Sequence, residues 1–206
     1  MTRFTPLSSL PKNLVVVGVD EVAMGTWAGP MVACAVAIHA GDTKVPGVAD
    51  SKTLSDTARE RLREPILSAC LDVGFGWVSN KEVDALGHEA AHRKVLVGAV
   101  MDLTVTPGRV YVDGRMYLPE LRHLPVEFVV SGDMLLWPIS AASILAKQEQ
   151  KFWMRTYAHV RWPGYGFDKH AGYGTKQHQE ALEKRGPCPI HRMSLKPLRR
   201  FNTEET

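Results

Sequence analysis

Four acidic residues share one local context in the sequence, because each lies at or just beyond the end of a β-rich run. They are Asp20, Glu21, Asp113 and Asp133. In an α/β sheet, side chains at strand ends can converge on one cleft, so acids from separate strands could meet there. Converging carboxylates repel one another unless protons or cations intervene, and oxygen-rich clusters with open positions suit Mg²⁺ or Mn²⁺. One such Asp alone would more simply form a turn or cap a helix, but the four together predict a site for divalent cations.

Asp20 and Glu21 are adjacent, and this raises a geometric question. Successive side chains of a strand point to opposite faces, so an ideal strand cannot direct both carboxylates into one site. We therefore expect the first strand to end at this pair. Ala23 is small and Gly25 has no side chain, so the two residues permit a sharp turn. Such a turn would let Glu21 swing round, or offer its backbone carbonyl, to the same ion.

The elements that must position these acids follow from the hydrophobic pattern. Strands are expected over residues 14–19, 31–38, 75–78, 110–112 and 126–130. Helices are expected over residues 56–70, 89–103, 139–159 and 176–185, with a further short helix opening at residue 79. The first two strands should pair as an antiparallel hairpin, and the last two should be buried strands of one sheet. This order predicts a three-layer α/β domain with a mixed central sheet flanked by helices, and a helical C-terminal portion.

Helix boundaries are marked by capping residues. Ser55 and Thr175 are candidate N-caps for the helices that follow them. Ser79 and Glu82 have the spacing of a capping box, and Gly186 should end the helix that begins after Thr175.

The composition is that of an ordinary globular chain. With 206 residues, of which 45% are hydrophobic, the chain can bury a real core, so we expect a single domain over residues 1–206. The longest apolar runs are far too short to cross a bilayer, and no secretory signal is expected. Cys34, Cys70 and Cys188 are odd in number and lack metal-ligand spacing, so reduced thiols and a cytoplasmic location are expected.

Charge is distributed unevenly along the chain. Residues 1–146 carry 13 Lys and Arg against 16 Asp and Glu, whereas residues 147–206 carry 12 against 6. We therefore expect a catalytic α/β core over about residues 14–146 and a basic helical portion that binds a polyanion over about residues 147–200. A merely solvated basic face would give the same counts, so this pattern alone leaves both interpretations open.

Several sequence blocks, in order, resemble the ribonuclease HII family. They are GVDEVAMGTWAGP, DSKTLS, YVDG, SGDMLLWPISAASILAK and GYGFDKHAGYGTKQH followed by PIHRMS. The resemblance implies a ribonuclease H-like fold and an endonuclease that cuts the RNA strand of RNA–DNA hybrids, leaving 3′-hydroxyl and 5′-phosphate ends. It places the family's four acidic residues on Asp20, Glu21, Asp113 and Asp133. These would hold two divalent metal ions, Mg²⁺ or Mn²⁺, with Asp20 as the bridging ligand.

The same resemblance implies a set of nucleic-acid contacts. The positions are Met24, Gly25, Ser51, Lys52, Lys147, His170, Tyr173 and Arg192. The two lysines would hold phosphates, and Tyr173 would stack on a sugar beside the RNA–DNA junction. Simpler roles stay open: solvated lysines, a tyrosine that packs its own loop, a hydrogen-bonding His170, and a helix-end charge at Arg192. The implied partner is an RNA–DNA hybrid or duplex DNA containing ribonucleotides, with no membrane involved and the protein acting as a monomer.

The sequence departs from the family pattern around the expected substrate groove. The departures are Ala23-Met24-Gly25 for Gly-Arg-Gly, Ser131 for lysine, an apolar stretch over residues 134–138, and Gln150-Lys151 for Arg-Asp. Losing the arginine removes a fork of N–H donors and a permanent charge. We therefore expect hydrolysis of RNA in hybrids with a weakened preference for a single embedded ribonucleotide. The alternatives are a catalytically weak hybrid-binding module and a nuclease for DNA alone.

Overall fold

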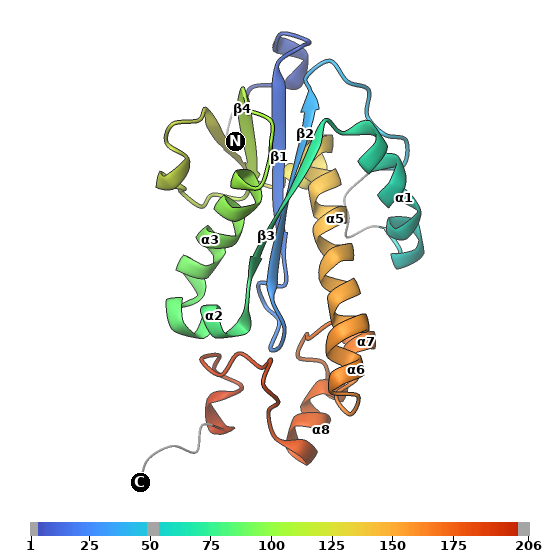
Figure 1. The fold of residues 1–206 in the computed structure, drawn as a ribbon, viewed down its shortest axis with the longest axis vertical. Helices are drawn as coiled ribbons and strands as arrows, with labels where there is room; N and C mark the ends of the chain where they lie inside the picture. Colours follow the sequence, from blue (N-terminus) through green and yellow to red (C-terminus); the bar gives the residue numbers. More distant parts are fainter. Residues whose placement is uncertain (1–3, 49–53, 202–206) are drawn as a thin grey trace.

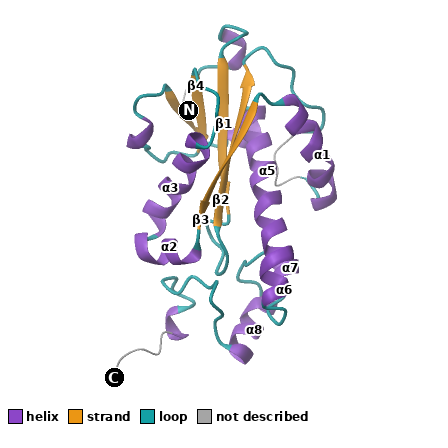
Figure 2. Cartoon of the chain, in the orientation of Figure 1, coloured by secondary structure: helices purple, strands orange, loops and turns teal. Residues whose placement is uncertain are grey.

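The computed structural model describes residues 4–48 and 54–201. At its centre lies a five-stranded sheet in the order β3-β2-β1-β4-β5 (Figures 1 and 2). The strands are β1 (Val15–Val22), β2 (Met31–His39), β3 (Asp72–Val78), β4 (Arg109–Asp113) and β5 (Val126–Val129). Strand β2 is antiparallel to both of its neighbours, β1 and β3, whereas β1, β4 and β5 run parallel to one another. The predicted hairpin and mixed sheet are confirmed.

Helices cover both faces of this sheet. They are α1 (Asp56–Ala69), α2 (Asn80–Leu86), α3 (His88–Met101), α4 (Gly132–Leu135) and α5 (Trp137–Trp153). Helix α3 packs on one face, and α5 with α1 covers the other (Figure 1). Two glycines allow this close approach, since a Cβ at Gly18 would collide with the backbone of Pro138 and one at Gly76 with the backbone of Val95. The central strands are therefore buried on both sides, as the three-layer prediction requires.

The capping residues begin their helices as predicted. Ser55 Oγ accepts the backbone N–H of Ala58 at 3.1 Å. Ser79 and Glu82 form the reciprocal capping box, with backbone-to-side-chain distances of 2.9 and 3.2 Å. Local sequence therefore fixes where α1 and α2 begin.

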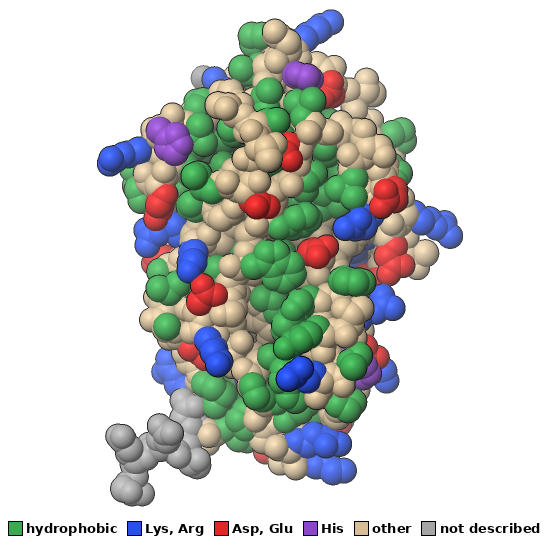
Figure 3. All heavy atoms as spheres, viewed as in Figure 1, with side chains coloured by type: hydrophobic (Ala, Val, Ile, Leu, Met, Phe, Trp, Pro, Cys, Tyr) green, Lys and Arg blue, Asp and Glu red, His purple; other side chains and the backbone are tan. Residues whose placement is uncertain are grey.

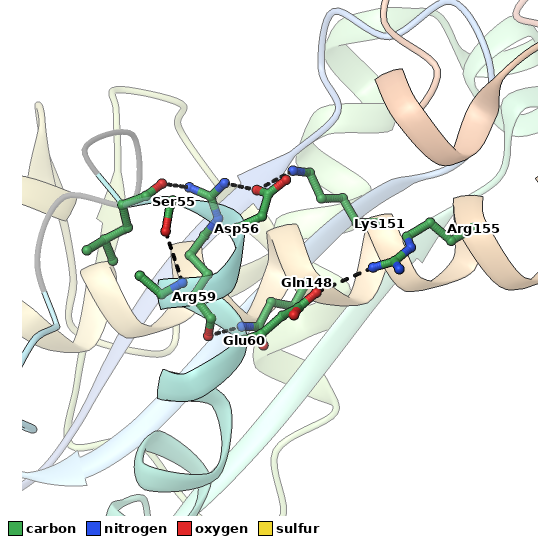
Figure 4. Close-up of polar contacts among 9 residues, drawn as sticks. Ser55, Asp56, Arg59, Glu60, Gln148, Lys151 and Arg155 are labelled. Atoms are coloured by element: carbon green, nitrogen blue, oxygen red, sulfur yellow. Dashed lines mark hydrogen bonds and ion pairs between the residues drawn. The ribbon is translucent and has the colours of Figure 1, made fainter.

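Ion pairs and a hydrogen bond link α1 to α5 (Figure 4). Lys151 Nζ lies 2.6 Å from Asp56 Oδ1, and Arg155 lies 3.3 Å from Glu60. The Gln148 amide donates to a backbone carbonyl of α1. Lys151, one of the departures from the family pattern, therefore links two helices in this structure.

The chain beyond α5 forms a C-terminal portion at the lower end of the molecule in Figure 1. Its elements are a π-helical turn (Met154–Ala158), α6 (His159–Arg161), α7 (Phe167–His170), α8 (Lys176–Arg185) and a 3-10 turn, η4 (Arg199–Phe201). Two other 3-10 turns, η1 (Leu7–Ser9) and η2 (Pro119–Leu121), come before α5 in the chain. The C-terminal portion has its own apolar cluster, with Met154, Phe167 and Leu182 among its buried members. Gln150 joins it to α5, because its buried amide donates to the Ala171 carbonyl at 3.0 Å.

Two further expectations from composition can be compared with the described part of the chain. The three cysteines form no disulfide, and Cys34 and Cys188 are buried. None of the helices in residues 4–48 and 54–201 is both long and apolar enough to cross a membrane.

Candidate active site

Strand β1 carries the adjacent acids Asp20 and Glu21 within its paired length. Pairing with β2 continues through both residues to Val22, so the prediction that the strand ends at the acidic pair is wrong. The chain turns at Ala23, whose φ is +67°, and Gly25 is not in the left-handed region. The hairpin hydrogen bonds extend past the acids. The two carboxylates therefore point to opposite faces of the sheet, as successive side chains of a strand do.

Asp20 faces α5 and is only 5% exposed. Its carboxylate accepts the Glu21 backbone N–H at 2.8 Å and the hydroxyl hydrogen of Ser143. The Lys147 ammonium donates to that hydroxyl at 2.8 Å, which completes a chain of contacts from α5 to Asp20. Burial first, and then the neighbouring Glu21 and Asp113 charges, raise the pKa of Asp20 to about 8. The ionised form of Asp20 is thus one that a nearby cation would stabilise.

Two further acids lie where β4 ends and α4 begins. Asp113 is the last residue of β4, the parallel neighbour of β1, and its Oδ1 accepts the Gly132 N–H at 2.7 Å. Ser131, at φ +56°, reverses the chain before α4. Asp133 follows in the first turn of α4, is 1% exposed, and its carbonyl accepts the Ser140 hydroxyl of α5. The two acids are therefore fixed at the strand ends beside α5, the helix that covers Asp20.

Glu21 points to the opposite face of the sheet. Its Oε2 lies 3.3 Å from Nε2 of His92 on α3, and both side chains are mostly buried. The expectation that Glu21 swings round to join Asp20 therefore does not hold for its side chain in this structure. His92 was not predicted, because its place beside Glu21 depends on how α3 packs on the sheet.

Arg192 holds the β1–β2 turn, residues 23–30, from inside the protein. The side chain is fully buried, with Nε donating to the Gly29 carbonyl at 3.1 Å and Nη1 donating to the Ala23 carbonyl at 2.7 Å. Burial lowers the pKa of Arg192 to about 10, which leaves it charged at neutral pH. The guanidinium therefore points inward and donates to the turn, and a contact of Arg192 with nucleic acid stays a prediction.

Three of the expected contacts lie at or beside this turn. Met24 is half-buried, and its carbonyl lies 3.0 Å from Nε2 of His88. Gly25 is exposed, and a Cβ there would meet no atom within 4 Å. Tyr173 is 43% exposed, and its phenol group is hydrogen-bonded to the Ala23 backbone. Met24, Gly25 and Tyr173 therefore all lie at this turn, with Gly25 and Tyr173 exposed and Met24 packed partly against the core on the α3 side.

The other expected contacts lie in different settings. Lys147 is half-buried beside the Asp20 carboxylate. His170 is 8% exposed and stacks on His178 with ring centroids 4.6 Å apart. His170 is therefore an interior residue of the C-terminal portion, and its contact with nucleic acid stays a prediction. Ser51 and Lys52 lie outside the described residues.

The acids offer an all-oxygen donor set, which is what hard divalent cations prefer. Within residues 4–48 and 54–201, however, no three acidic, histidine or cysteine side chains form a ready-made metal cage. Mg²⁺ is usually held by one or two carboxylates together with water and substrate phosphates. The residues present therefore fit a divalent ion that completes its coordination with groups from outside the protein.

A mixed sheet with acids on adjacent parallel strands, helices on both faces and a helical C-terminal portion defines a ribonuclease H-like enzyme. The model of the ribonuclease HII family matches residues 17–198. This chain belongs to the ribonuclease HII family.

Individual members of the family are similar to most of the chain. Ribonuclease HII of Syntrophobacter fumaroxidans is 43% identical over 90% of this chain and 78% of the relative. Ribonuclease HII of Halorhodospira halophila is 44% identical over 90% of this chain and 94% of the relative. A structure of the PCNA:RNase HII complex from Archaeoglobus fulgidus matches with a TM-score of 0.73 at 25% identity, covering 89% of this chain and 96% of that one.

Proposed function

We propose that this protein cleaves the RNA strand of RNA–DNA hybrids to 3′-hydroxyl and 5′-phosphate ends, with two divalent ions, Mg²⁺ or Mn²⁺, as cofactors. Family membership supports the RNA-strand endonuclease activity. The observation that supports the metal site is Asp20, buried beside Asp113 with its pKa raised to about 8. An ionised carboxylate in that position is costly unless a cation neutralises it.

The four acids have distinct tasks in this proposal. Asp20, Asp113 and Asp133 offer carboxylate oxygens on the α5 side of the sheet. Glu21 contributes its backbone carbonyl, or its side chain after a rotation away from His92. Divalent ions bound there would supply an activated water for in-line attack and stabilisation of the leaving 3′ oxygen.

Two residues of α5 support Asp20. The Ser143 hydroxyl donates to the Asp20 carboxylate and restricts its rotation. Lys147 donates to Ser143, and an ammonium group has three N–H donors, so Lys147 can also bind a substrate phosphate. We propose that this lysine couples the position of the phosphate to that of Asp20.

The proposed substrate surface consists of Met24, Gly25, Lys147 and Tyr173, together with the segment that carries Ser51 and Lys52. Arg192 and His170 support this surface from the interior. Methionine at position 24 provides packing area but no charged donor, so we propose a weakened preference for a single embedded ribonucleotide. The partner is an RNA–DNA hybrid or duplex DNA containing ribonucleotides, acted on by a cytoplasmic monomer.

Cleavage of three labelled duplexes tests the proposal: one with a long RNA tract, one with a single ribonucleotide, and one of DNA alone. We expect metal-dependent cleavage of the long tract, weaker cleavage at the single ribonucleotide and none of the DNA. Equal cleavage of the first two would refute the weakened junction preference. Binding of the hybrid without cleavage in either metal would instead identify a hybrid-binding module, and cleavage of the DNA duplex would identify a DNA nuclease.

A further inference from the structure

An aromatic pocket lies at the β3 edge of the sheet, away from β4, the strand that carries Asp113. It encloses about 720 Å³ between the end of β3, the start of α2 and the π-helical turn after α5. Its aromatic members are Trp77, Trp153, Tyr157 and Trp162. Figure 3 views this side of the molecule, where hydrophobic side chains gather over β3 and basic side chains lie near the lower end. None of these side chains takes part in the proposed cleavage.

The rings of this aromatic pocket are arranged around Tyr157. The centroid of Tyr157 lies 4.9 Å from that of Trp153 and 6.1 Å from that of Trp162, which it meets edge to face. Tyr157 is 45% exposed and Trp77 is 39% exposed. Ring surface that is fixed by packing yet open to solvent is suited to stacking with a flat ligand.

The backbone of the pocket is also unusual. Tyr157 belongs to the π-helical turn Met154–Ala158, which interrupts an otherwise α-helical run. π-Helical turns are rare, and they occur frequently at functional sites. Met154 is buried against Gly29 of the β1–β2 turn, where a Cβ would collide with its sulfur, so the turn is anchored on its inner side. The π-helical turn is therefore held in place by Met154 on its inner side, while Tyr157 is exposed on its outer side.

Two basic residues complete the rim of the aromatic pocket. The Arg161 guanidinium lies 5.7 Å from the Tyr157 ring centroid, and Lys81 is exposed in the first turn of α2. The neighbouring Glu82 is already bound to Ser79 and to another lysine. In the part of the chain that the structure describes, no carboxylate lies within ion-pair distance of Arg161 or Lys81. The rim is therefore complementary to an anionic ligand.

We propose that the aromatic pocket binds an unpaired nucleotide of single-stranded nucleic acid. Aromatic rings beside basic side chains are the usual means of holding single strands, with a base stacked on a ring and the phosphate near a cation. A proline-rich peptide also uses aromatic grooves, but it has no need of the two rim cations. The occupant would be a single-stranded extension beside the duplex that the enzyme cleaves. The inference rests on the proposed function only for the presence of nucleic acid.

Binding to single-stranded DNA in metal-free buffer tests this inference separately from cleavage. A labelled twelve-nucleotide strand is titrated with the full chain, and tryptophan quenching and fluorescence anisotropy are followed. Removal of one stacking ring weakens such binding by about 5- to 150-fold, so Tyr157→Ala should fall in that range and Tyr157→Phe should bind as the native protein does. Arg161→Gln should also weaken binding and lower its salt dependence.

Matched controls separate the pocket from general surface effects. Tyr117→Ala and Arg122→Gln remove an exposed tyrosine and an exposed arginine elsewhere, and both should leave binding unchanged. Equal binding by Tyr157→Ala, Tyr117→Ala and the native protein would overturn the inference. Binding of AMP as tight as that of the twelve-nucleotide strand would also overturn it. So would binding of a proline-rich peptide in the pocket while the strand does not bind there. Failure of hybrid cleavage in any of these proteins would bear on the proposed function and not on this binding.

Discussion

Asp20 and Arg192 are two buried charged residues near the β1–β2 turn, and burial has a different consequence for each. Burial and neighbouring acids raise the pKa of Asp20, so its ionised form is unfavourable until a cation binds beside it. Arg192 is buried with equal completeness, but carbonyls of the β1–β2 turn accept from it. Both residues therefore cost folding free energy through burial, but the hydrogen bonds of Arg192 to the turn offset part of its cost, whereas that of Asp20 serves the binding of a cation.

The substitution Asp20→Asn should stabilise the metal-free protein while abolishing cleavage. The amide oxygen can still accept the Glu21 N–H. With a pKa of about 8, Asp20 must take up a proton when the metal-free protein folds at neutral pH, and asparagine avoids that cost. We expect the free energy of unfolding to rise by about 1–2 kcal/mol and the cleavage rate to fall on the order of 100-fold or more. Urea unfolding in EDTA and a hybrid cleavage assay measure the two effects. Glu89→Gln, at an exposed position, is the control, and a destabilised Asp20→Asn protein would contradict the account.

Replacement of Arg192 by lysine tests its role inside the protein. Lysine cannot reproduce the two donations to Gly29 and Ala23, so we expect a loss of about 2–4 kcal/mol in urea unfolding. Arg199→Lys, at an exposed position, should cost well under 1 kcal/mol. If Arg192→Lys left stability intact and instead lowered the salt dependence of hybrid binding, the residue would be a phosphate contact after all.

At the scale of elements, the sequence predicts those features that local chemistry determines. The capping box at Ser79 and the N-cap at Ser55 lie where expected, because each involves residues three positions apart. The end of β1 was misplaced because the hydrogen bonds of β2 carry the strand past its acids. Ser143 could have been found from its spacing of four to Lys147 on a helix. His92 could not, since no local pattern fixes how α3 packs.

The C-terminal portion should lose stability in acid because of its buried histidines. Nε2 of His178 lies 3.0 Å from Nε2 of His191, and burial lowers the pKa of each to about 4. The unfolded chain binds protons near pH 6.5 and the folded one near pH 4, so stability is full above 6.5 and falls as the pH drops toward 4. The loss has a ceiling of about 3 kcal/mol per histidine.

The difference in the free energy of urea unfolding between pH 7.5 and pH 5.0 is compared in the native protein and in His178→Gln. Asp20 responds to pH in the opposite direction but equally in both proteins, so the comparison measures the histidine contribution. His178→Gln should reduce the difference between the two pH values, even if it lowers stability at both. His123→Gln, at an exposed position, should keep the native difference. An unchanged difference in His178→Gln would contradict the assignment of the acid response to the buried histidines.

For the molecule as a whole, the acids and the β1–β2 turn form a single unit with the C-terminal portion. Arg192 comes from the C-terminal portion, yet it fixes the turn that follows Asp20. Tyr173, from the same portion, is hydrogen-bonded to that turn. Substrate recognition is therefore expected to depend on the turn and the C-terminal portion together.

The substitution Met24→Arg tests this expectation for the choice of substrate. It restores a charged donor fork at this half-buried position of the turn, where we expect it to strengthen cleavage at a single ribonucleotide by about 10-fold relative to a long RNA tract. The ratio of the two kcat/KM values is the measurement. Met101→Arg adds the same charge at a distant exposed position and should leave the ratio unchanged. An unchanged ratio in Met24→Arg would place junction recognition elsewhere.

The most direct test of the central claim is the initial rate of cleavage of a long RNA–DNA hybrid as Mg²⁺ or Mn²⁺ is titrated, with the native protein and Asp20→Asn side by side. We expect saturable metal-dependent cleavage by the native protein and products with 3′-hydroxyl ends. For Asp20→Asn we expect the rate to fall by on the order of 100-fold or more. Cleavage that needs no divalent ion, or that survives intact in Asp20→Asn, would contradict the assignment of the strand-end acids as the catalytic site.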